Sequence, residues 1–358
     1  MKSIARRMPE SVGGYFGPLA RKKRFPDFLI IGAQKAGTTW LHRNLQAHSQ
    51  IWMPKEKELH YFDEKLGAET SLRSKLWGER AMDERWRRQV RRQMGRYSKF
   101  SASDIAWDLR YFLGSWNDDW YASLFAQGKG KTVGETTPDY SLLGRKQIAH
   151  VHEIMPEVKI VFLMRNPIER AWSQSLMDVR ERNIEDVTDE EFYRHFESKR
   201  SRMFSDYLRT LENWGAFFPE RQIFVGFLED VHFYPNRLLA RVYRFLKVDP
   251  SADYRVIRRK IHSRDVETMP TRLAVGLAES YLEGARALEE RFGGYASFWR
   301  HTAERLVGDP PAEERIAYPL WESPLWANWA EETGLEPAPG SREASPQSGP
   351  LPNVRMAW

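Results

Sequence analysis

The stretch DFLIIGAQKAGTTWLHRNLQAH, residues 27–48, decides the fold. Its apolar run FLII at 28–31 ends at Gly32 and is typical of a parallel strand that is buried on both faces. From Thr38 onward the apolar residues recur at helical spacing, with Leu41 followed by Leu45. A strand, a glycine turn and a helix in this order indicate an α/β protein.

Two later stretches repeat this pattern. KIVFLM at 159–164 and QIFVGFL at 222–228 are buried-strand candidates, and each precedes a stretch with helical spacing. Residues 271–292 predict one long helix. The alternation predicts an α/β, P-loop-like, three-layer fold with a central parallel sheet flanked by helices.

The chain divides by composition into four parts. We expect a basic lead-in over 1–24, one large domain over 25–300, a Trp-rich extension over 301–333 and a disordered tail over 334–358. The tail is rich in Pro, Gly and Ser, which disfavours a packed core. The tryptophans of WESPLWANWA, at 321–330, are expected to pack against the body.

Composition excludes several kinds of chemistry. The 358 residues include no cysteine, so disulfides, thiolate catalysis and cysteine metal sites are ruled out. The chain has no apolar run of about 18 residues and no apolar leader after its first methionine. We therefore expect no transmembrane segment and a cytoplasmic location.

The formal net charge of +6 is compatible with plain solubility or with an anionic ligand. Positive charge gathers in RKKR at 21–24 and in ERWRRQVRRQMGR at 84–96. The second run is either a solvated helix face or a contact for an anionic acceptor or a membrane surface. We expect no nucleic-acid partner, and peripheral association with a membrane stays open.

The glycine loop departs from the loop of nucleotide triphosphatases. GAQKAGTT at 32–39 has two glycines at the spacing of G-x-x-x-x-G-K-[ST], but Thr38 stands where the lysine belongs. The lysine is Lys35, inside the loop. A helix N-terminus with free N–H groups suits a phosphate, and this arrangement suits a single 5′-phosphate with a lysine at its leaving side. The alternatives are an ordinary turn with an incidental lysine, and a P-loop kinase or other phosphotransferase.

QKAGTTWL resembles the 5′-phosphosulfate loop of sulfotransferases that use 3′-phosphoadenosine 5′-phosphosulfate (PAPS). The resemblance implies that Lys35 contacts the oxygen bridging phosphate and sulfate. It also implies that Ala36, Gly37, Thr38 and Thr39 form the cradle of the 5′-phosphate. PAPS would be the co-substrate, and no metal is expected, since no metal-ligand spacing such as H-E-x-x-H occurs.

The family needs a second anchor for the 3′-phosphate. KIVFLMRNPIERAWSQS at 159–175 places Arg165 after a strand and Ser173 eight residues later on a helix. An arginine and a hydroxyl so placed can converge on one phosphate. Arg170 is a rival that could instead serve helix packing. In KIHSRDVETMP at 260–270, where family members have a loop over the nucleotide, Arg264 is a further candidate contact.

The segment PKEKELHYFD at 54–63 resembles the KE-x-H-F-F-D segment of glycosaminoglycan (heparan sulfate)-type sulfotransferases. The resemblance implies that Glu58 is the general base and that His60 assists it. Alternation along an extended stretch would place Glu58, His60 and Phe62 on one face. His60 as the base is one alternative, and a surface charge patch is another.

A third segment, GETTPDY at 134–140, resembles the strand and turn that line the acceptor cleft of glycosaminoglycan-type members. It implies that Glu135 and Tyr140 bind the acceptor, while Thr136 replaces the usual lysine. The sequence therefore predicts sulfuryl transfer from PAPS to a hydroxyl or amine of a carbohydrate or other anionic acceptor. A lipid or small-metabolite acceptor and a non-catalytic anion-binding module are the remaining alternatives.

Overall fold

The computed structural model describes residues 23–67, 72–94, 102–180, 182–251 and 267–334. The predicted tail therefore lies outside the described residues, apart from Gly334, as do Arg264 and Arg96 and nearly all of the basic lead-in.

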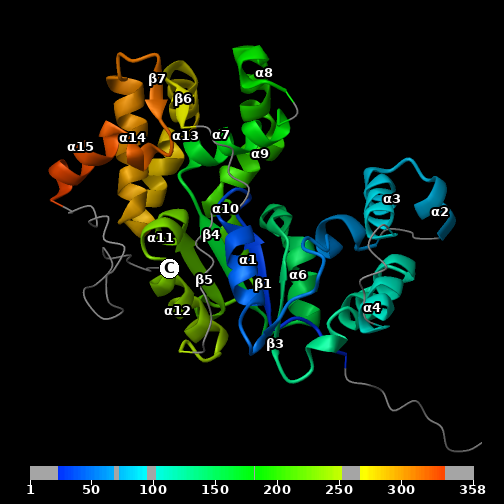
Figure 1. Ribbon diagram of the computed structural model, residues 1–358. Coiled ribbons are helices and arrows are strands. Elements are labelled where there is room, and N and C mark those ends of the chain that lie inside the picture. Colours follow the sequence, from blue (N-terminus) through cyan, green and yellow to red (C-terminus); the bar gives the residue numbers. More distant parts are fainter. Residues whose placement is uncertain (1–22, 68–71, 95–101, 181, 252–266, 335–358) are drawn as a thin grey trace, which may run out of the picture.

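A five-stranded sheet forms the centre of the molecule (Figure 1). Every paired strand is parallel, and the order is β2-β3-β1-β4-β5. The strands are β1 (Phe28–Gly32), β2 (Ile51–Trp52), β3 (Thr132–Thr136), β4 (Lys159–Met164) and β5 (Ile223–Phe227). Three of them match the three strands predicted from apolar runs, and the predicted α/β class is confirmed.

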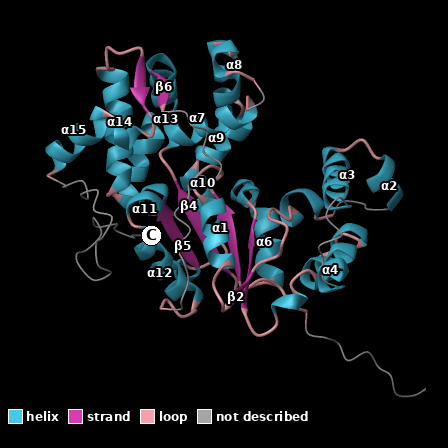
Figure 2. Ribbon diagram, viewed as in Figure 1, coloured by secondary structure: helices cyan, strands magenta, loops and turns pink. Residues whose placement is uncertain are grey.

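Helices flank this sheet and connect its strands (Figure 2). They are α1 (Thr38–Gln46), α5 (Asp118–Ser123), α6 (Arg145–Ile154), α7 (Pro167–Asp178), α8 (Asp189–Glu197), α9 (Lys199–Ser205), α10 (Tyr207–Gly215), α11 (Leu228–Phe233) and α12 (Pro235–Leu246). Because parallel strands need crossovers, the carboxyl ends of β1 and β4 open at the same edge of the sheet. The loops that carry Lys35 and Arg165 leave from this edge.

Two groups of helices lie on opposite sides of the sheet (Figure 1). One group consists of α2 (Leu72–Trp77), α3 (Ala81–Met94) and α4 (Ala102–Leu113). The other consists of α13 (Thr271–Phe292), α14 (Tyr295–Gly308) and α15 (Pro324–Thr333), with the antiparallel pair β6 (Thr268–Pro270) and β7 (Arg315–Ala317). The helix predicted over 271–292 is confirmed, and α14 runs across the domain boundary expected at residue 300.

The Trp-rich extension packs against the body, as expected. Trp329 is buried, and Trp326 contacts the rings of Phe298, Phe233 and Trp329. In the described part of the chain, no helix combines the length and the apolar character needed to cross a bilayer.

Candidate active site

The loop between β1 and α1 presents backbone to a ligand. Lys35 and Gly37 have left-handed backbones, with φ of 70° and 89°. A Cβ at Gly37 would meet Leu228 Cδ1 at 3.1 Å, so glycine suits this position both by conformation and by space. Helix α1 begins with no side-chain cap and no acidic residue in its first turn. Its positive end is therefore available to an anion.

The residues of this loop differ in accessibility. Ala36 and Thr38 are buried, whereas Lys35, Gly37 and Thr39 are half-buried. The buried pair anchors the loop, and the other three remain within reach of a ligand. The loop therefore fits the phosphate group that the sequence predicts for it.

Burial and the nearby Arg165 charge lower the pKa of the Lys35 ammonium to about 8, while Asp178 acts in the opposite sense. A lysine loses its charge more readily when it is desolvated beside another cation. An anionic ligand placed between Lys35 and Arg165 would relieve that repulsion. The two charges therefore lie within electrostatic reach of each other, and an anion there would favour the charged form of Lys35.

Arg165 lies directly after β4 and is 6% exposed. Its Nη1 donates to the backbone carbonyl of Lys35 at 3.2 Å, which joins the two proposed phosphate anchors. Its Nε donates to Glu169 Oε2 at 3.2 Å and its Nη2 to the Tyr318 hydroxyl at 2.7 Å. Burial opposes the charge, but Tyr318 and Glu169 outweigh it and raise the pKa of Arg165. The guanidinium is therefore always charged and held in one orientation.

The rival arginine has a different environment. Arg170 is fully buried and donates to Ser205, Gln174 and Ser201. It ties α7 to α9, so its described contacts are structural. Ser173 is partly exposed on α7, and its role as a phosphate ligand stays a prediction.

The extended conformation predicted for residues 54–63 is wrong. Glu58 and His60 both have left-handed backbones, with φ of 66° and 52°, and residues Tyr61–Lys65 form a π-helical turn. The alternation therefore fails, and Phe62 is buried with Tyr61 instead of sharing an exposed face with Glu58. A bond from the Glu58 N–H to the Thr136 carbonyl, at 2.9 Å, fixes the segment against the end of β3.

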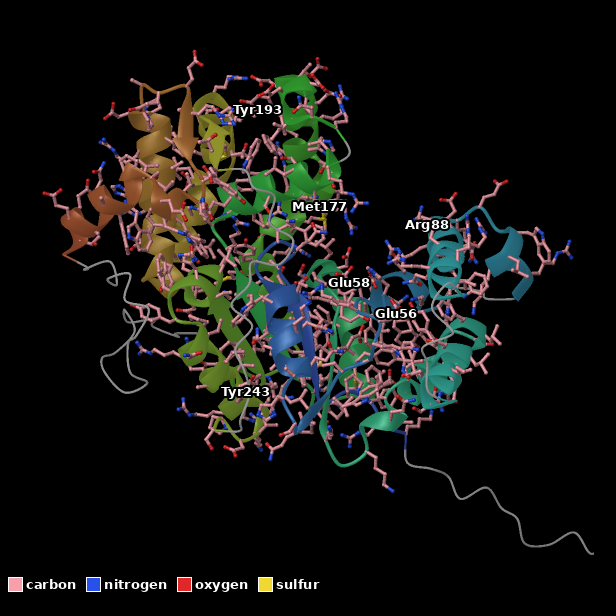
Figure 3. The ribbon with its side chains drawn as sticks, in the orientation of Figure 1. Glu56, Glu58, Arg88, Met177, Tyr193 and Tyr243 are labelled. Atoms are coloured by element: carbon pink, nitrogen blue, oxygen red, sulfur yellow. The ribbon has the colours of Figure 1, made fainter. Side chains whose placement is uncertain are left out.

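Glu58 nevertheless keeps a partly exposed carboxylate, and its role as the general base stays a prediction. Its side chain is 41% exposed, and Figure 3 shows it on the side of the sheet that faces α3. Lys57 Nζ lies 2.6 Å from Glu58 Oε1, and His60 Nε2 lies 3.9 Å from Oε2. Burial opposes ionisation, but Lys57 and His60 outweigh it and hold the pKa of Glu58 below its ordinary value. The ionised form of the carboxylate, which is the form that can accept a proton, is therefore favoured.

His60 is buried, and its Nδ1 lies 2.6 Å from Asp63 Oδ2. Burial lowers its pKa, but Asp63 and Glu64 more than compensate and the pKa of His60 is raised. His60, Asp63 and Glu64 offer ligand atoms within 4.8 Å of one another, at metal-site spacing. However, Glu64 is paired with Arg85 at 2.7 Å and Asp63 with His60, so the cluster is neutralised by protein groups.

The GETTPDY segment packs against residues 58–61 and holds two of its own polar side chains buried. Glu135 is 1% exposed and Tyr140 is fully buried, and the Tyr140 hydroxyl donates to Glu135 Oε1 at 2.9 Å. The backbone N–H of Tyr61 donates to the same hydroxyl at 3.0 Å. The predicted acceptor contacts of Glu135 and Tyr140 stay predictions, and an acceptor would reach these side chains only if the packing opened. Thr136 bonds His42 Nδ1 at 3.0 Å.

Sequence reasoning missed three residues of this site. Lys57 neutralises Glu58, and its charge also acts on Lys35 and His42. Burial, Lys57 and Arg43 lower the pKa of His42 to about 4, so this histidine is neutral. The KEKE run signals Lys57, whereas His42 and Tyr318 carry no sequence signal because each reaches the site only through the fold.

The sequence model of the Sulfotransferase family matches residues 26–252, which include the loop, Glu58 and Arg165. The match covers more than half of the chain. The chain belongs to the Sulfotransferase family and is a sulfotransferase (EC 2.8.2 class), and the family implies a PAPS-type sulfate donor.

Two curated relatives are similar over part of their length. The membrane-associated sulfotransferase kil1 of Dictyostelium discoideum is 27% identical over 149 residues, which are 42% of this chain and 22% of that protein. The bifunctional heparan sulfate N-deacetylase/N-sulfotransferase of Drosophila melanogaster is 25% identical over 245 residues, 64% of this chain and 20% of that protein. The matched regions thus span about a fifth of these relatives.

Solved structures of sulfotransferases resemble the chain more loosely. The sulfotransferase from Alicyclobacillus acidocaldarius is 22% identical with a TM-score of 0.49, covering 74% of this chain and 94% of that one. The sulfotransferase domain of the Synechococcus PCC 7002 olefin synthase is 17% identical with a TM-score of 0.45, covering 75% and 98%.

Proposed function

We propose that the protein transfers the sulfuryl group of PAPS to a hydroxyl or amine of an anionic, carbohydrate-like acceptor, with Glu58 as the general base. One observation carries the donor side of this proposal. The Arg165 guanidinium donates to the backbone carbonyl of Lys35 at 3.2 Å, which supports assigning the two residues to one nucleotide site. Two anchors suit a nucleotide that carries phosphate at both 5′ and 3′ positions.

The chain's own groups then have distinct roles. PAPS supplies an electrophilic sulfur on a phosphate leaving group. Lys35 holds positive charge where negative charge grows on the departing oxygen. Glu58 accepts the proton of the acceptor through Oε2, since Oε1 is engaged by Lys57. Asp63 raises the pKa of His60 against the effect of burial, and a charged His60 favours the ionised form of the Glu58 carboxylate.

Exposed cations next to Glu58 support an anionic acceptor. Arg85 and Arg200 are 39% and 58% exposed, and they pair with Glu64 and Asp139. Burial raises the pKa of Asp139, Arg200 and His60 oppose that rise, and Glu58 adds to it, so these charges lie within electrostatic reach of Asp139. A sulfated or carboxylated sugar could exchange for the acidic partners of these arginines. The heparan sulfate relative has an acceptor of this kind in its name.

Sulfate transfer from radiolabelled PAPS to a panel of acidic and neutral glycans, lipids and phenols tests this proposal. The wild type is compared with Lys35→Ala and Glu58→Gln, and Glu56→Gln serves as the matched control. We expect labelling of an acidic glycan by the wild type and the control only. Labelling of no acceptor, together with failure to bind 3′-phosphoadenosine 5′-phosphate, would contradict the proposal.

A lipid-presented acceptor is a second candidate, favoured by one observation. Six large hydrophobic side chains are exposed in the described residues, and all but Val307 lie on α2 and α4. They are Leu76, Trp77, Ile105, Leu109 and Leu113. The last three recur every fourth residue, so they form a stripe along α4. The arginine-rich α3 packs against α2, and apolar and basic side chains together suit an anionic membrane surface.

Sedimentation with vesicles separates the two candidates. The lipid candidate predicts binding to vesicles that contain an anionic lipid, and loss of that binding in Leu109→Ser/Leu113→Ser. Val307→Ser removes an exposed apolar side chain on α14 and should change nothing. No vesicle binding by the wild type would leave the soluble anionic glycan as the acceptor to test.

A further inference from the structure

The Arg165 anchor is completed by a segment far along the chain. Tyr318 lies 153 positions after Arg165, beyond the region 26–252 that matches the family. It follows β7, which pairs with β6 through Met269↔Ile316, and its N–H donates to the Glu267 carbonyl at 2.8 Å. The C-terminal part of the chain therefore carries a tyrosine back to the predicted 3′-phosphate site.

Two contacts hold this segment against Arg165, just after β4, and against Glu169 in the first turn of α7. The Tyr318 hydroxyl accepts from Arg165 Nη2 at 2.7 Å, and the Leu320 N–H donates to Glu169 Oε1 at 2.5 Å. Glu169 also accepts from Arg165 through its other oxygen. Arg165, Glu169, Tyr318 and Leu320 thus form one network, in which Glu169 and Leu320 are fully buried.

Some N–H groups of Arg165 and the hydroxyl proton of Tyr318 are not used by the bonds described within this network. A guanidinium has two N–H groups on each terminal nitrogen, and the described bonds of Arg165 use one on Nη1 and one on Nη2. The Tyr318 oxygen accepts from Arg165, so its own proton is still there to be donated. Tyr318 is half-buried, and the Arg165 guanidinium carbon lies 5.4 Å from its ring centre. A phosphate oxygen on Arg165 would thus lie beside the phenol.

We propose that Tyr318 is part of the 3′-phosphate site: its hydroxyl orients Arg165 and donates its own proton to a phosphate oxygen. The inference rests on the proposed use of PAPS. It makes Tyr318 a specificity residue, because its hydroxyl serves only a nucleotide that has a 3′-phosphate. An adenine nucleotide without that group gains nothing from it.

Calorimetric binding to Tyr318→Phe tests this role. The variant keeps the ring and loses the hydroxyl. We expect affinity for 3′-phosphoadenosine 5′-phosphate to fall by about tenfold, the effect of losing one hydrogen bond to a charged group. Affinity for adenosine 5′-monophosphate should stay within about twofold. Tyr193→Phe is the matched control, since its hydroxyl donates to the Arg272 carbonyl at 3.3 Å on the surface of α8 (Figure 3).

A second measurement uses the wild type and so does not depend on how the variant folds. Amide hydrogen exchange over residues 315–322 should slow when 3′-phosphoadenosine 5′-phosphate is added and stay unchanged with adenosine 5′-monophosphate. Equal effects of the two nucleotides in either experiment would overturn the role of Tyr318 and leave the proposed function standing. If the wild type binds neither nucleotide, it is the proposed function that fails.

Discussion

Lys57 Nζ lies 2.6 Å from Oε1 of Glu58, and this ion pair sets the state of the proposed base. It favours the charged form of the carboxylate and leaves Oε2 outside the ion pair, 3.9 Å from His60 Nε2. The left-handed backbone of Glu58 and its bond to the Thr136 carbonyl hold the pair at the end of β3. The base is thus positioned by main chain and tuned by its neighbour in sequence.

Replacing Glu58 by Gln should abolish most of the turnover. Sulfate transfer is expected to fall by about 10²- to 10⁴-fold, the usual contribution of a general base, because an amide cannot take the proton. The melting temperature should hardly change, since the side chain is 41% exposed. Glu56→Gln, two residues away and also partly exposed, should keep wild-type rates. Full turnover in Glu58→Gln would show that another group is the base.

Removing the Lys57 charge should change the pH profile rather than the fold. Lys57 depresses the pKa of Glu58, so Lys57→Met should raise that pKa. A base with a higher pKa is protonated at higher pH, and the acid limb of kcat/KM should therefore move upward. Lys146→Met, on the exposed face of α6, should leave the limb in place. An unshifted acid limb in Lys57→Met would separate Glu58 from the ionisation that controls rate.

Loss of the Lys35 proton should cause the fall of kcat/KM at alkaline pH. The pKa of its ammonium is lowered to about 8, so the charge needed beside the leaving group is lost as pH rises through that value. The kcat/KM for PAPS should therefore fall above about pH 8. Lys35→Arg stays charged in this pH range, so its kcat/KM should show no alkaline fall. Its maximal rate should be lower, because the planar guanidinium does not reproduce the compact ammonium charge. An identical alkaline limb in Lys35→Arg would assign it to another group.

Substitution of Arg165 should affect nucleotide binding, whereas substitution of Arg170 should affect stability. Arg165→Lys is expected to weaken binding of 3′-phosphoadenosine 5′-phosphate by about tenfold, with little effect on adenosine 5′-monophosphate, because lysine lacks the planar fork. Arg170→Lys should instead lower the melting temperature by about 5 °C, since Ser201, Ser205 and Gln174 lose bonds. Calorimetry and thermal unfolding check both. If Arg170→Lys instead selectively weakened binding of the 3′-phosphorylated nucleotide, Arg170 and not Arg165 would be the 3′-phosphate ligand.

The sequence predicted what depends on local pattern. The apolar run of β4 and the periodicity of α13 gave those elements at their observed bounds, Lys159–Met164 and Thr271–Phe292. β2 is two residues long and β3 contains Gly134 and Glu135, so neither shows in sequence the apolar run that predicts a buried strand. The alternation of side chains wrongly predicted an extended stretch at residues 54–63, because one backbone bond to Thr136 and a π-helical turn set the conformation there.

The sequence motifs predicted the candidate residues of the first three segments but not the tyrosine contributed by the C-terminal part of the chain. Lys35, Glu58 and Arg165 stand in segments that resemble family motifs, and the fold places each at the sheet edge. Tyr318 lies 153 positions from Arg165, and only the docking of the C-terminal segment on α7 brings them together. No local pattern encodes such a contact.

The most direct test of the two-anchor site is titration of the wild-type protein with 3′-phosphoadenosine 5′-phosphate and, separately, with ADP and Mg²⁺. The arrangement of Lys35 and Arg165 predicts tight binding of the first nucleotide, independent of Mg²⁺, and much weaker binding of the second. Tighter binding of ADP that requires Mg²⁺ would contradict the account, since it would mean that the loop serves a nucleoside polyphosphate and that Arg165 holds no 3′-phosphate.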